Sequence, residues 1–212
     1  MKKQDQRTYA DLLLGIGAVS LKMLPDYYTW ASGWRSPIYC DNRKTLSHVE
    51  IREFVLQCAV EFIEKEYPHI DVIAGIANGG IAMGALIAGK LRKPFVYVRE
   101  SQKTHGLENV IEGVLTPDQN VGIFEDLLST GGSTLKAVTT LKNAGTNVLF
   151  TMANFSYQFA SMEERFAAEN IQLHPISNYE TLIAVAVEKG YIKEDDLPIL
   201  TEWRKTPETW GL

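Results

Sequence analysis

The stretch that decides the fold is VGIFEDLLSTGGST, Val121–Thr134. An apolar run leads straight into two carboxylates, Glu125 and Asp126, and a small polar loop follows at 129–133. Backbone N–H groups of such a loop can surround a phosphate, and the N-terminus of the helix behind it adds partial positive charge. The two glycines of the loop allow left-handed backbone and a close approach to an anion. The stretch therefore predicts a phosphate-binding turn with an acidic pair at its entrance.

Other glycine motifs fit this chain poorly. A Walker A loop requires a lysine that this loop lacks, and a dinucleotide fingerprint requires a third glycine. Gly15-Ile16-Gly17 has only two glycines and follows a leucine-rich helical pattern, so we interpret it as a helix end or turn. An ordinary β-turn-α junction also favours Gly and Ser at a helix start, and on the motif alone this alternative stays open.

Composition indicates an ordinary globular protein. A length of 212 residues with 45% hydrophobic and 22% charged residues predicts one domain with a sizeable core. The formal net charge of −5 argues against broad attraction to nucleic acid or to an anionic membrane. Two cysteines, Cys40 and Cys58, are too few for a disulfide framework, and we expect buried thiols. The longest apolar run, 81–89, is far shorter than the ~20 residues of a membrane span, so we expect a soluble cytoplasmic protein.

Strand and helix patterns alternate along the middle of the chain. Apolar strand patterns lie at 71–76, 95–98, 121–124, 147–152 and 171–176. Helical patterns lie at 8–21, 50–66, 81–91, 133–143, 162–168, 180–189 and 194–203, with capping-box signatures at Ser47/Glu50 and Ser177/Glu180. This alternation predicts an α/β fold with a parallel sheet flanked by helices and a ligand site at the carboxyl ends of the strands. We expect a single domain over 1–212, with a core at about 46–170 and a small hood built from about 1–45 and parts of 170–212.

A second group of polar residues lies in a long loop at 99–118. Arg99, Lys103 and His105 bring three basic groups together within seven residues. A loop of this length in a compact domain is often a lid or a binding loop, and Arg and Lys both suit phosphate groups. A solvated surface loop that happens to carry three bases is the competing interpretation. The other histidines have no metal ligand at a suitable spacing, and we expect no metal site made of protein side chains alone.

Three segments of the chain resemble the orotate phosphoribosyltransferases, a branch of the type I phosphoribosyltransferase family. Thr29–Ser47 is similar to the family's Ser-Gly-x-x-Ser-Pro segment, which helps to form the orotate pocket. The loop with Arg99, Lys103 and His105 and the motif at 125–133 also match the family. The resemblance implies transfer of the ribose phosphate of 5-phosphoribosyl 1-diphosphate (PRPP) to orotate, giving orotidine 5′-monophosphate and diphosphate in pyrimidine synthesis. It further implies Mg²⁺ as cofactor and a homodimer whose loop reaches into the neighbouring site.

The same resemblance assigns roles to individual residues. Lys103, with Arg99 and His105, would act in catalysis. Orotate would contact Ser129 and Tyr39. The residues that would bind PRPP are Arg99, Lys103, His105, Glu125, Asp126, Leu127, Leu128, Ser129, Thr130, Gly131, Gly132 and Ser133. Mg²⁺ would be carried mainly by the substrate and by water, as is usual for this ion.

Several positions depart from the family pattern. Basic residues of many members are replaced by Glu100, Ala31, Gly79 or a neighbour, and the Asn154-Phe155-Ser156-Tyr157 run. These replacements leave open how the carboxylate of orotate is held. Ser129, backbone amides, Arg35 and Arg43 are the candidates.

Two other functions remain as alternatives. A phosphoribosyltransferase for another base would share the PRPP motif, but it would lack the SPIYCDNR segment and the basic loop. A regulator that senses PRPP without catalysis would be expected to carry a nucleic-acid-binding module or a basic face. The acidic balance of this chain and the absence of a recognisable extra module in it argue against the second alternative.

Overall fold

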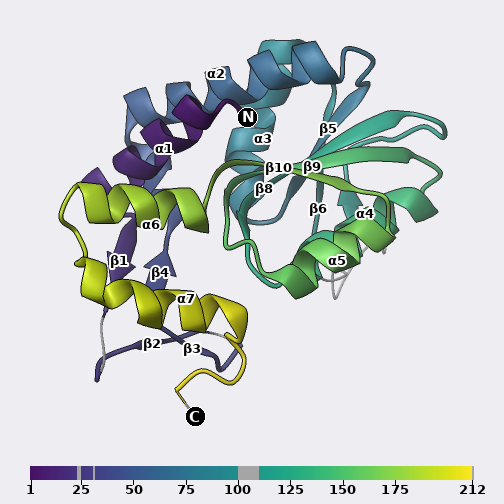
Figure 1. The fold of residues 1–212 in the computed structure, drawn as a ribbon. Helices are drawn as coiled ribbons and strands as arrows, with labels where there is room; N and C mark the ends of the chain where they lie inside the picture. The colour runs from purple at the N-terminus through teal and green to yellow at the C-terminus, as the bar shows by residue number, and fades with distance from the viewer. Residues whose placement is uncertain (23–24, 31, 100–109, 212) are drawn as a thin grey trace.

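A central six-stranded sheet organises the protein (Figure 1). The computed structural model describes residues 1–22, 25–30, 32–99 and 110–211. The strands of the sheet are β5 (Val72–Ile76), β6 (Phe95–Val98), β7 (Ile111–Glu112), β8 (Asn120–Leu128), β9 (Asn147–Ser156) and β10 (Gln172–Asn178). They lie in the order β10-β9-β8-β5-β6-β7, and every neighbouring pair is parallel except β6–β7. The prediction of an α/β fold with a mostly parallel sheet is thus confirmed.

Helices cover both faces of this sheet (Figure 1). The helices packed on it are α1 (Lys3–Gly15), α2 (Val49–Glu66), α3 (Gly79–Leu91), α4 (Gly132–Asn143) and α5 (Ala160–Ala168). The first three lie on one side of the sheet, and α4 and α5 lie on the other. Because both faces are covered, the central strand β5 is wholly apolar, and every one of its residues is buried.

The N- and C-terminal segments meet beside the sheet and form a smaller layer (Figure 1). It contains the strand pairs β1 (Val19–Leu21) with β4 (Ile38–Cys40) and β2 (Tyr28–Thr29) with β3 (Arg35–Ser36), the short helices η1 (Asn42–Ser47) and η2 (Glu194–Asp196), and helices α6 (Tyr179–Glu188) and α7 (Leu197–Lys205). Trp203 of α7 is fully buried, and its indole N–H donates to the carbonyl of Arg35 at 3.0 Å. Its ring packs edge-on against Trp30. Aromatic contacts therefore join the two ends of the chain.

Several helix boundaries and caps predicted from local sequence patterns differ from those in the structure. The predicted helix at 8–21 is wrong beyond Gly15, because Gly17 takes a left-handed φ of 61° and the chain turns into β1. Both predicted capping boxes are also wrong. His48 precedes α2 without a side-chain cap, and at α6 the side chain of Asn178 accepts from the Thr181 N–H at 2.9 Å. Ser177 instead donates to the carbonyl of Gln6 at 2.8 Å, so a tertiary contact, and not helix capping, uses the hydroxyl of Ser177.

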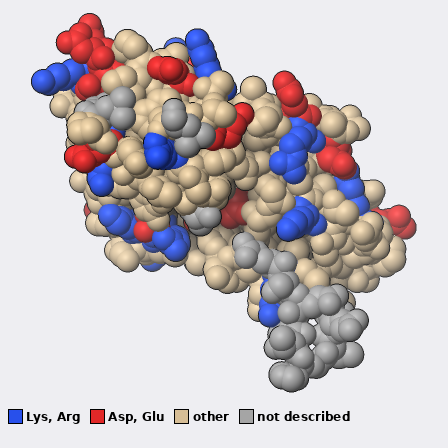
Figure 2. All heavy atoms as spheres, turned by 90° about the horizontal axis from the view of Figure 1, so that it is seen from below, with Lys and Arg blue, Asp and Glu red and all other residues tan. Residues whose placement is uncertain are grey.

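The two cysteines have the buried, reduced state expected from the sequence. Cys40 and Cys58 are both buried and free. No helix within the described residues is long and apolar enough to cross a membrane. On the face seen in Figure 2, acidic and basic side chains are interspersed among the residues drawn in colour. That mixture provides no broad basic surface for a polyanion on the visible part of this face.

Candidate active site

Strand β8 carries the acidic pair to the edge of the sheet. It continues past the predicted apolar run, so Glu125 and Asp126 belong to the strand itself. Phe124 is the last residue of β8 paired with β5, whereas Glu125 still pairs with Ala153 of β9. The sheet therefore opens on one side of the acidic pair, and this opening is where the site forms.

The two carboxyl groups have different environments. Glu125 is 6% exposed, and Asp126 is only half-buried. The N–H of Asp126 donates to Oε1 of Glu125 at 2.8 Å. Burial first, and then the hydrogen bond and negative charge of Asp126, raise the pKa of Glu125 well above its usual value. Without a ligand, Glu125 thus holds a proton more strongly than an exposed carboxyl group does.

The loop after β8 has the geometry of an anion-binding turn. Gly131 precedes α4 with a left-handed φ of 72°, which only glycine adopts without strain. A Cβ on Gly131 would also lie 2.7 Å from side-chain atoms of Met162 and Phe166, so helix α5 packs directly against the turn. The first N–H groups of α4 have no partner within the helix. Together with the helix dipole, they favour a phosphate group at this position.

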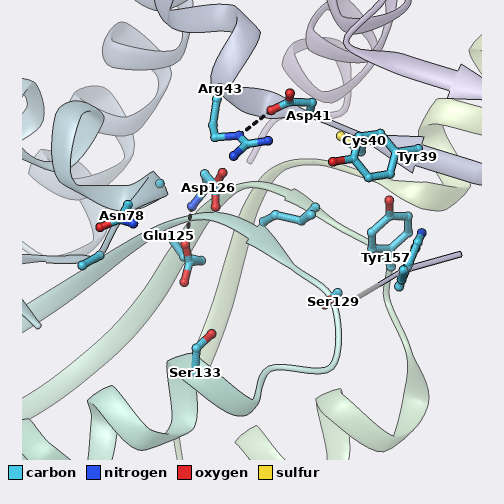
Figure 3. Close-up of a pocket in the computed structure, with 14 residues that line it drawn as sticks. Tyr39, Cys40, Asp41, Arg43, Asn78, Glu125, Asp126, Ser129, Ser133 and Tyr157 are labelled. Atoms are coloured by element: carbon cyan, nitrogen blue, oxygen red, sulfur yellow. Dashed lines mark hydrogen bonds and ion pairs between the residues drawn. The ribbon is translucent and has the colours of Figure 1, made fainter. Parts of the chain in front are cut away.

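A cavity of about 430 Å³ lies between this edge of the sheet and the N-terminal segments (Figure 3). Its lining residues are Trp30, Tyr39, Cys40, Asp41, Arg43, Ala77, Asn78, Gly79, Glu125, Asp126, Leu127, Ser129, Ser133 and Tyr157. The rings of Trp30 and Tyr157 lie 4.9 Å apart, and Tyr39 is 42% exposed. Such a cavity suits a planar ring with a few polar groups to orient it.

Charges in this cavity are mostly negative. Asp41, Glu125 and Asp126 line it, and Arg43 is the one Lys or Arg among its described lining residues. Nε of Arg43 donates to Oδ1 of Asp41 at 2.7 Å, as Figure 3 shows. The hydrogen bond from Arg43 lowers the pKa of Asp41, and that carboxylate in turn raises the pKa of the guanidinium.

The residues named from the sequence do not all share one cavity. Arg99 lines a neighbouring cavity of about 790 Å³ with Ser133 and Lys136, and its Nη1 lies 3.4 Å from Oε1 of Glu112. Ser133, at the start of α4, borders both cavities. Leu128 is fully buried, so only its main chain could meet a ligand. Lys103 and His105 lie outside the described residues, as do Ala31 and Glu100.

The structure gives a steric reason for glycine at position 79, one of the positions where this chain differs from the family pattern. A Cβ on Gly79 would lie 2.3 Å from Cγ of Asp126 and 2.5 Å from each of its carboxylate oxygens. A lysine at this position would therefore require the side chain of Asp126 to move. The carboxylate of Asp126 occupies the space that the Cβ of a larger residue would need.

Of the two arginines considered for the orotate carboxylate, only Arg43 lies in the cavity. Arg35 donates to the carbonyl of Gly211, and its guanidinium lies 4.9 Å from the ring centre of Tyr27. Trp30 and Asp41, which line the cavity, lie in the Thr29–Ser47 segment expected at the orotate pocket but were not singled out, and Tyr157 was missed as a lining residue. The Asp-Asn-Arg run after β4 was the available signal, since charged residues directly after a strand often reach a ligand edge.

Side chains in the described ranges, 1–22, 25–30, 32–99 and 110–211, include no group of three or more His, Cys, Asp or Glu that could hold a metal ion. Glu125 and Asp126 nevertheless offer hard oxygen donors, which Mg²⁺ prefers. Mg²⁺ usually keeps several waters and binds through one or two carboxylates plus substrate phosphates. The described residues therefore fit a magnesium ion that arrives with a phosphorylated substrate.

Comparison with known proteins defines the class first: the phosphoribosyl transferase domain model matches residues 50–155, which contain the β8 motif. The orotate phosphoribosyltransferase of Bacteroides thetaiotaomicron is 46% identical over 208 residues, covering 98% of each chain. That of Listeria innocua is 44% identical over 206 residues, covering 97% of this chain and 98% of its own. The solved orotate phosphoribosyltransferase of Aeropyrum pernix matches with a TM-score of 0.73 at 26% identity, over 87% of this chain and 99% of that one. The chain belongs to the phosphoribosyltransferase family, in the branch of the orotate phosphoribosyltransferases.

Proposed function

We propose that this protein transfers the 5-phosphoribosyl group of PRPP to orotate, giving orotidine 5′-monophosphate and diphosphate in pyrimidine biosynthesis. One observation carries the proposal. The acidic pair of β8, the glycine turn of α4 and three aromatic side chains border a single cavity or its immediate edge. The full-length similarity to orotate phosphoribosyltransferases supports the same substrate.

The turn at 129–133 would bind the 5′-phosphate of PRPP. Free backbone N–H groups at the start of α4 supply donors, and Ser129 and Ser133 line the cavity nearby. Glu125 and Asp126 would accept hydrogen bonds from the ribose hydroxyls, since carboxylates are strong acceptors. These contacts would fix the sugar with its C1 atom facing the aromatic part of the cavity.

Orotate would lie against Tyr39 and near Ser129, where its ring meets aromatic surface. The C1–O bond of PRPP breaks with its electron pair going to diphosphate. N1 of orotate forms the new bond to C1 and loses its proton, which passes to the departing diphosphate or to water. The ribose gains oxocarbenium character, which the nearby carboxylates stabilise electrostatically. No protein nucleophile is required in this scheme.

Departure of diphosphate would be assisted by Lys103, Arg99 and His105. One preorganised donor of this kind contributes roughly 3–4 kcal/mol to transition-state stabilisation. Asp126 and Glu125, which line the cavity, would help to hold Mg²⁺, and the ion would supply charge neutralisation for the diphosphate. Closure of the loop over the site would exclude water and limit hydrolysis of PRPP.

Mg²⁺ dependence, a homodimer with shared active sites and a cytoplasmic location are part of the same proposal. They rest on the likeness to the orotate family. In such a dimer, the basic loop of one protomer would complete the cavity of its partner.

The decisive experiment follows the ultraviolet absorbance of orotate in the presence of PRPP and Mg²⁺. Uracil, hypoxanthine and adenine are supplied as competing bases. We expect consumption of orotate with release of diphosphate and little reaction of the other bases. Preferred use of a purine, or PRPP binding without turnover of any base, would overturn the proposal.

A further inference from the structure

Orotate is an anion, yet the cavity proposed to receive it is lined by three carboxylates, Asp41, Glu125 and Asp126. An uncompensated carboxylate brought next to them would be repelled. Glu125 holds its proton more strongly than usual, which relieves part of this repulsion. A positively charged partner is still required for the carboxylate of the base.

The segment after β4 delivers such a partner on a rigid support. Asn42 is 2% exposed, and its Nδ2 donates to the carbonyl of Asp126 at 2.9 Å. The hydroxyl of Tyr9 donates to Oδ1 of Asn42 at 3.4 Å, and the hydroxyl of Thr45 donates to its carbonyl at 2.6 Å. The residue before Arg43 is thus fixed to the acidic strand itself.

Asp41, on the other side of Asn42, orients the guanidinium. It accepts from Nε of Arg43 at 2.7 Å, and within the described part of the chain both terminal nitrogens of Arg43 remain without a hydrogen-bond partner. Figure 3 shows the guanidinium above Asp126, beside Asp41. Two terminal N–H groups in one plane match the two oxygens of a carboxylate.

We propose that Arg43 is the residue that binds the carboxylate of orotate and so selects orotate over neutral pyrimidines, with Asp41 and Asn42 as its positioning residues. This inference rests on the proposed function. Arg43 and Tyr39, the expected orotate contact, come from the same segment and line the same cavity. Arg99, from the basic loop expected at the diphosphate, lines the neighbouring cavity instead. The missing basic residues of the family are thereby replaced by a cation from a different element.

The test compares steady-state kinetics of the wild type with Arg43→Gln, Arg43→Lys and Asp41→Asn. The side chain of Arg43 is 62% exposed, so these variants should fold, and thermal unfolding checks this. Arg35→Gln is the matched control, because Arg35 lies in the same segment but outside the cavity. Uracil serves as the probe that lacks the carboxylate.

For Arg43→Gln we expect the KM for orotate to rise about 10- to 100-fold, the range of a charge-assisted pair, with the KM for PRPP nearly unchanged. The ratio of kcat/KM for orotate to that for uracil should fall by the same factor. Arg43→Lys should recover part of the loss, Asp41→Asn should show a smaller rise in the orotate KM, and Arg35→Gln should match the wild type.

An unchanged orotate KM in Arg43→Gln, equal losses for orotate and uracil, or a loss confined to PRPP would each overturn this inference. Such results with an active wild type would leave the proposed function intact. A wild type that does not transfer phosphoribose to orotate would instead defeat the proposed function itself.

Discussion

Gly79 offers a sharp test of the placement of Asp126, because the two residues compete for the same space. Gly79 is the first residue of α3, and a Cβ there would lie 2.3 Å from Cγ of Asp126. Real Cβ atoms essentially never approach another atom this closely, so Gly79→Ala must displace the carboxylate. The Asp126 side chain can rotate, and therefore the variant should fold with its carboxylate moved away from the ribose position.

The expected loss can be worked from the contacts of one carboxylate. A hydrogen bond to a charged group contributes about 1.5–3 kcal/mol, which corresponds to roughly 10- to 100-fold in kcat/KM for PRPP. Stability should change much less, because alanine is favoured over glycine in a helix by about 0.5–1 kcal/mol and offsets part of the strain. The signature is therefore a large kinetic loss in a protein of nearly normal stability.

Gly89→Ala, in the same helix, is the matched control, since a Cβ at Gly89 meets no atom within 4 Å. We expect it to raise the free energy of unfolding by about 0.5–1 kcal/mol and to leave PRPP kinetics unchanged. The assays are initial rates with varied PRPP and chemical denaturation of both variants. Wild-type kcat/KM for PRPP in Gly79→Ala would refute the assignment of Asp126 to the ribose.

Three further predictions concern the support of the site, its chemistry and its charge. Asn42→Leu should lower the free energy of unfolding by about 1–3 kcal/mol in chemical denaturation, because the Asp126 carbonyl and the Tyr9 hydroxyl lose their partner; an unchanged midpoint would contradict this. Lys103→Ala should lower kcat far more than it weakens orotate binding, and a kcat near that of the wild type would contradict a catalytic role for Lys103. Mixing Lys103→Ala with Asp126→Asn protomers should restore some activity if the sites are shared between subunits. No recovery despite proven exchange of subunits would contradict a shared site. Burial raises the pKa of Glu125 in the folded protein above its pKa in the unfolded chain. Ionisation of Glu125 therefore lowers the stability of the fold as the pH rises from the unfolded pKa through the folded pKa. Glu125→Gln should therefore gain stability relative to wild type as the pH is raised above the ordinary carboxyl range, and a difference that stays constant with pH in thermal unfolding would rule this out.

The phosphate turn was predictable because its signals are local. An apolar run before Glu125 and glycines at 131 and 132 specify a strand end and a tight turn by their own conformational preferences. The structure adds two separate reasons for a glycine at position 131: its positive φ, and its close contact with α5, which leaves no room for a Cβ. That contact joins residues far apart in the sequence, so no local pattern contained it.

Features that depend on distant contacts were missed. β7 was expected as loop, since a two-residue strand is specified by its antiparallel pairing with β6 and not by its own sequence. Ser177 looked like a helix cap, but Gln6 of the N-terminal helix accepts its hydroxyl. In both cases a tertiary partner decided the outcome over local propensity.

The departures from the family pattern show the same limit most clearly. By sequence alone, Gly79 or a neighbour was interpreted as the place of a lost cation. In the structure, the carboxylate of Asp126 fills the space beside Gly79, so a residue with a Cβ there would force that carboxylate to move. Asn42 is bonded to the main chain of that same Asp126 and holds Arg43 over the cavity. Because the anchor of Asn42 is the main-chain carbonyl of Asp126, a larger residue at position 79 should move the Asp126 carboxylate without releasing the Asp41–Arg43 segment. Gly79→Ala should therefore affect PRPP kinetics and leave the KM for orotate nearly unchanged.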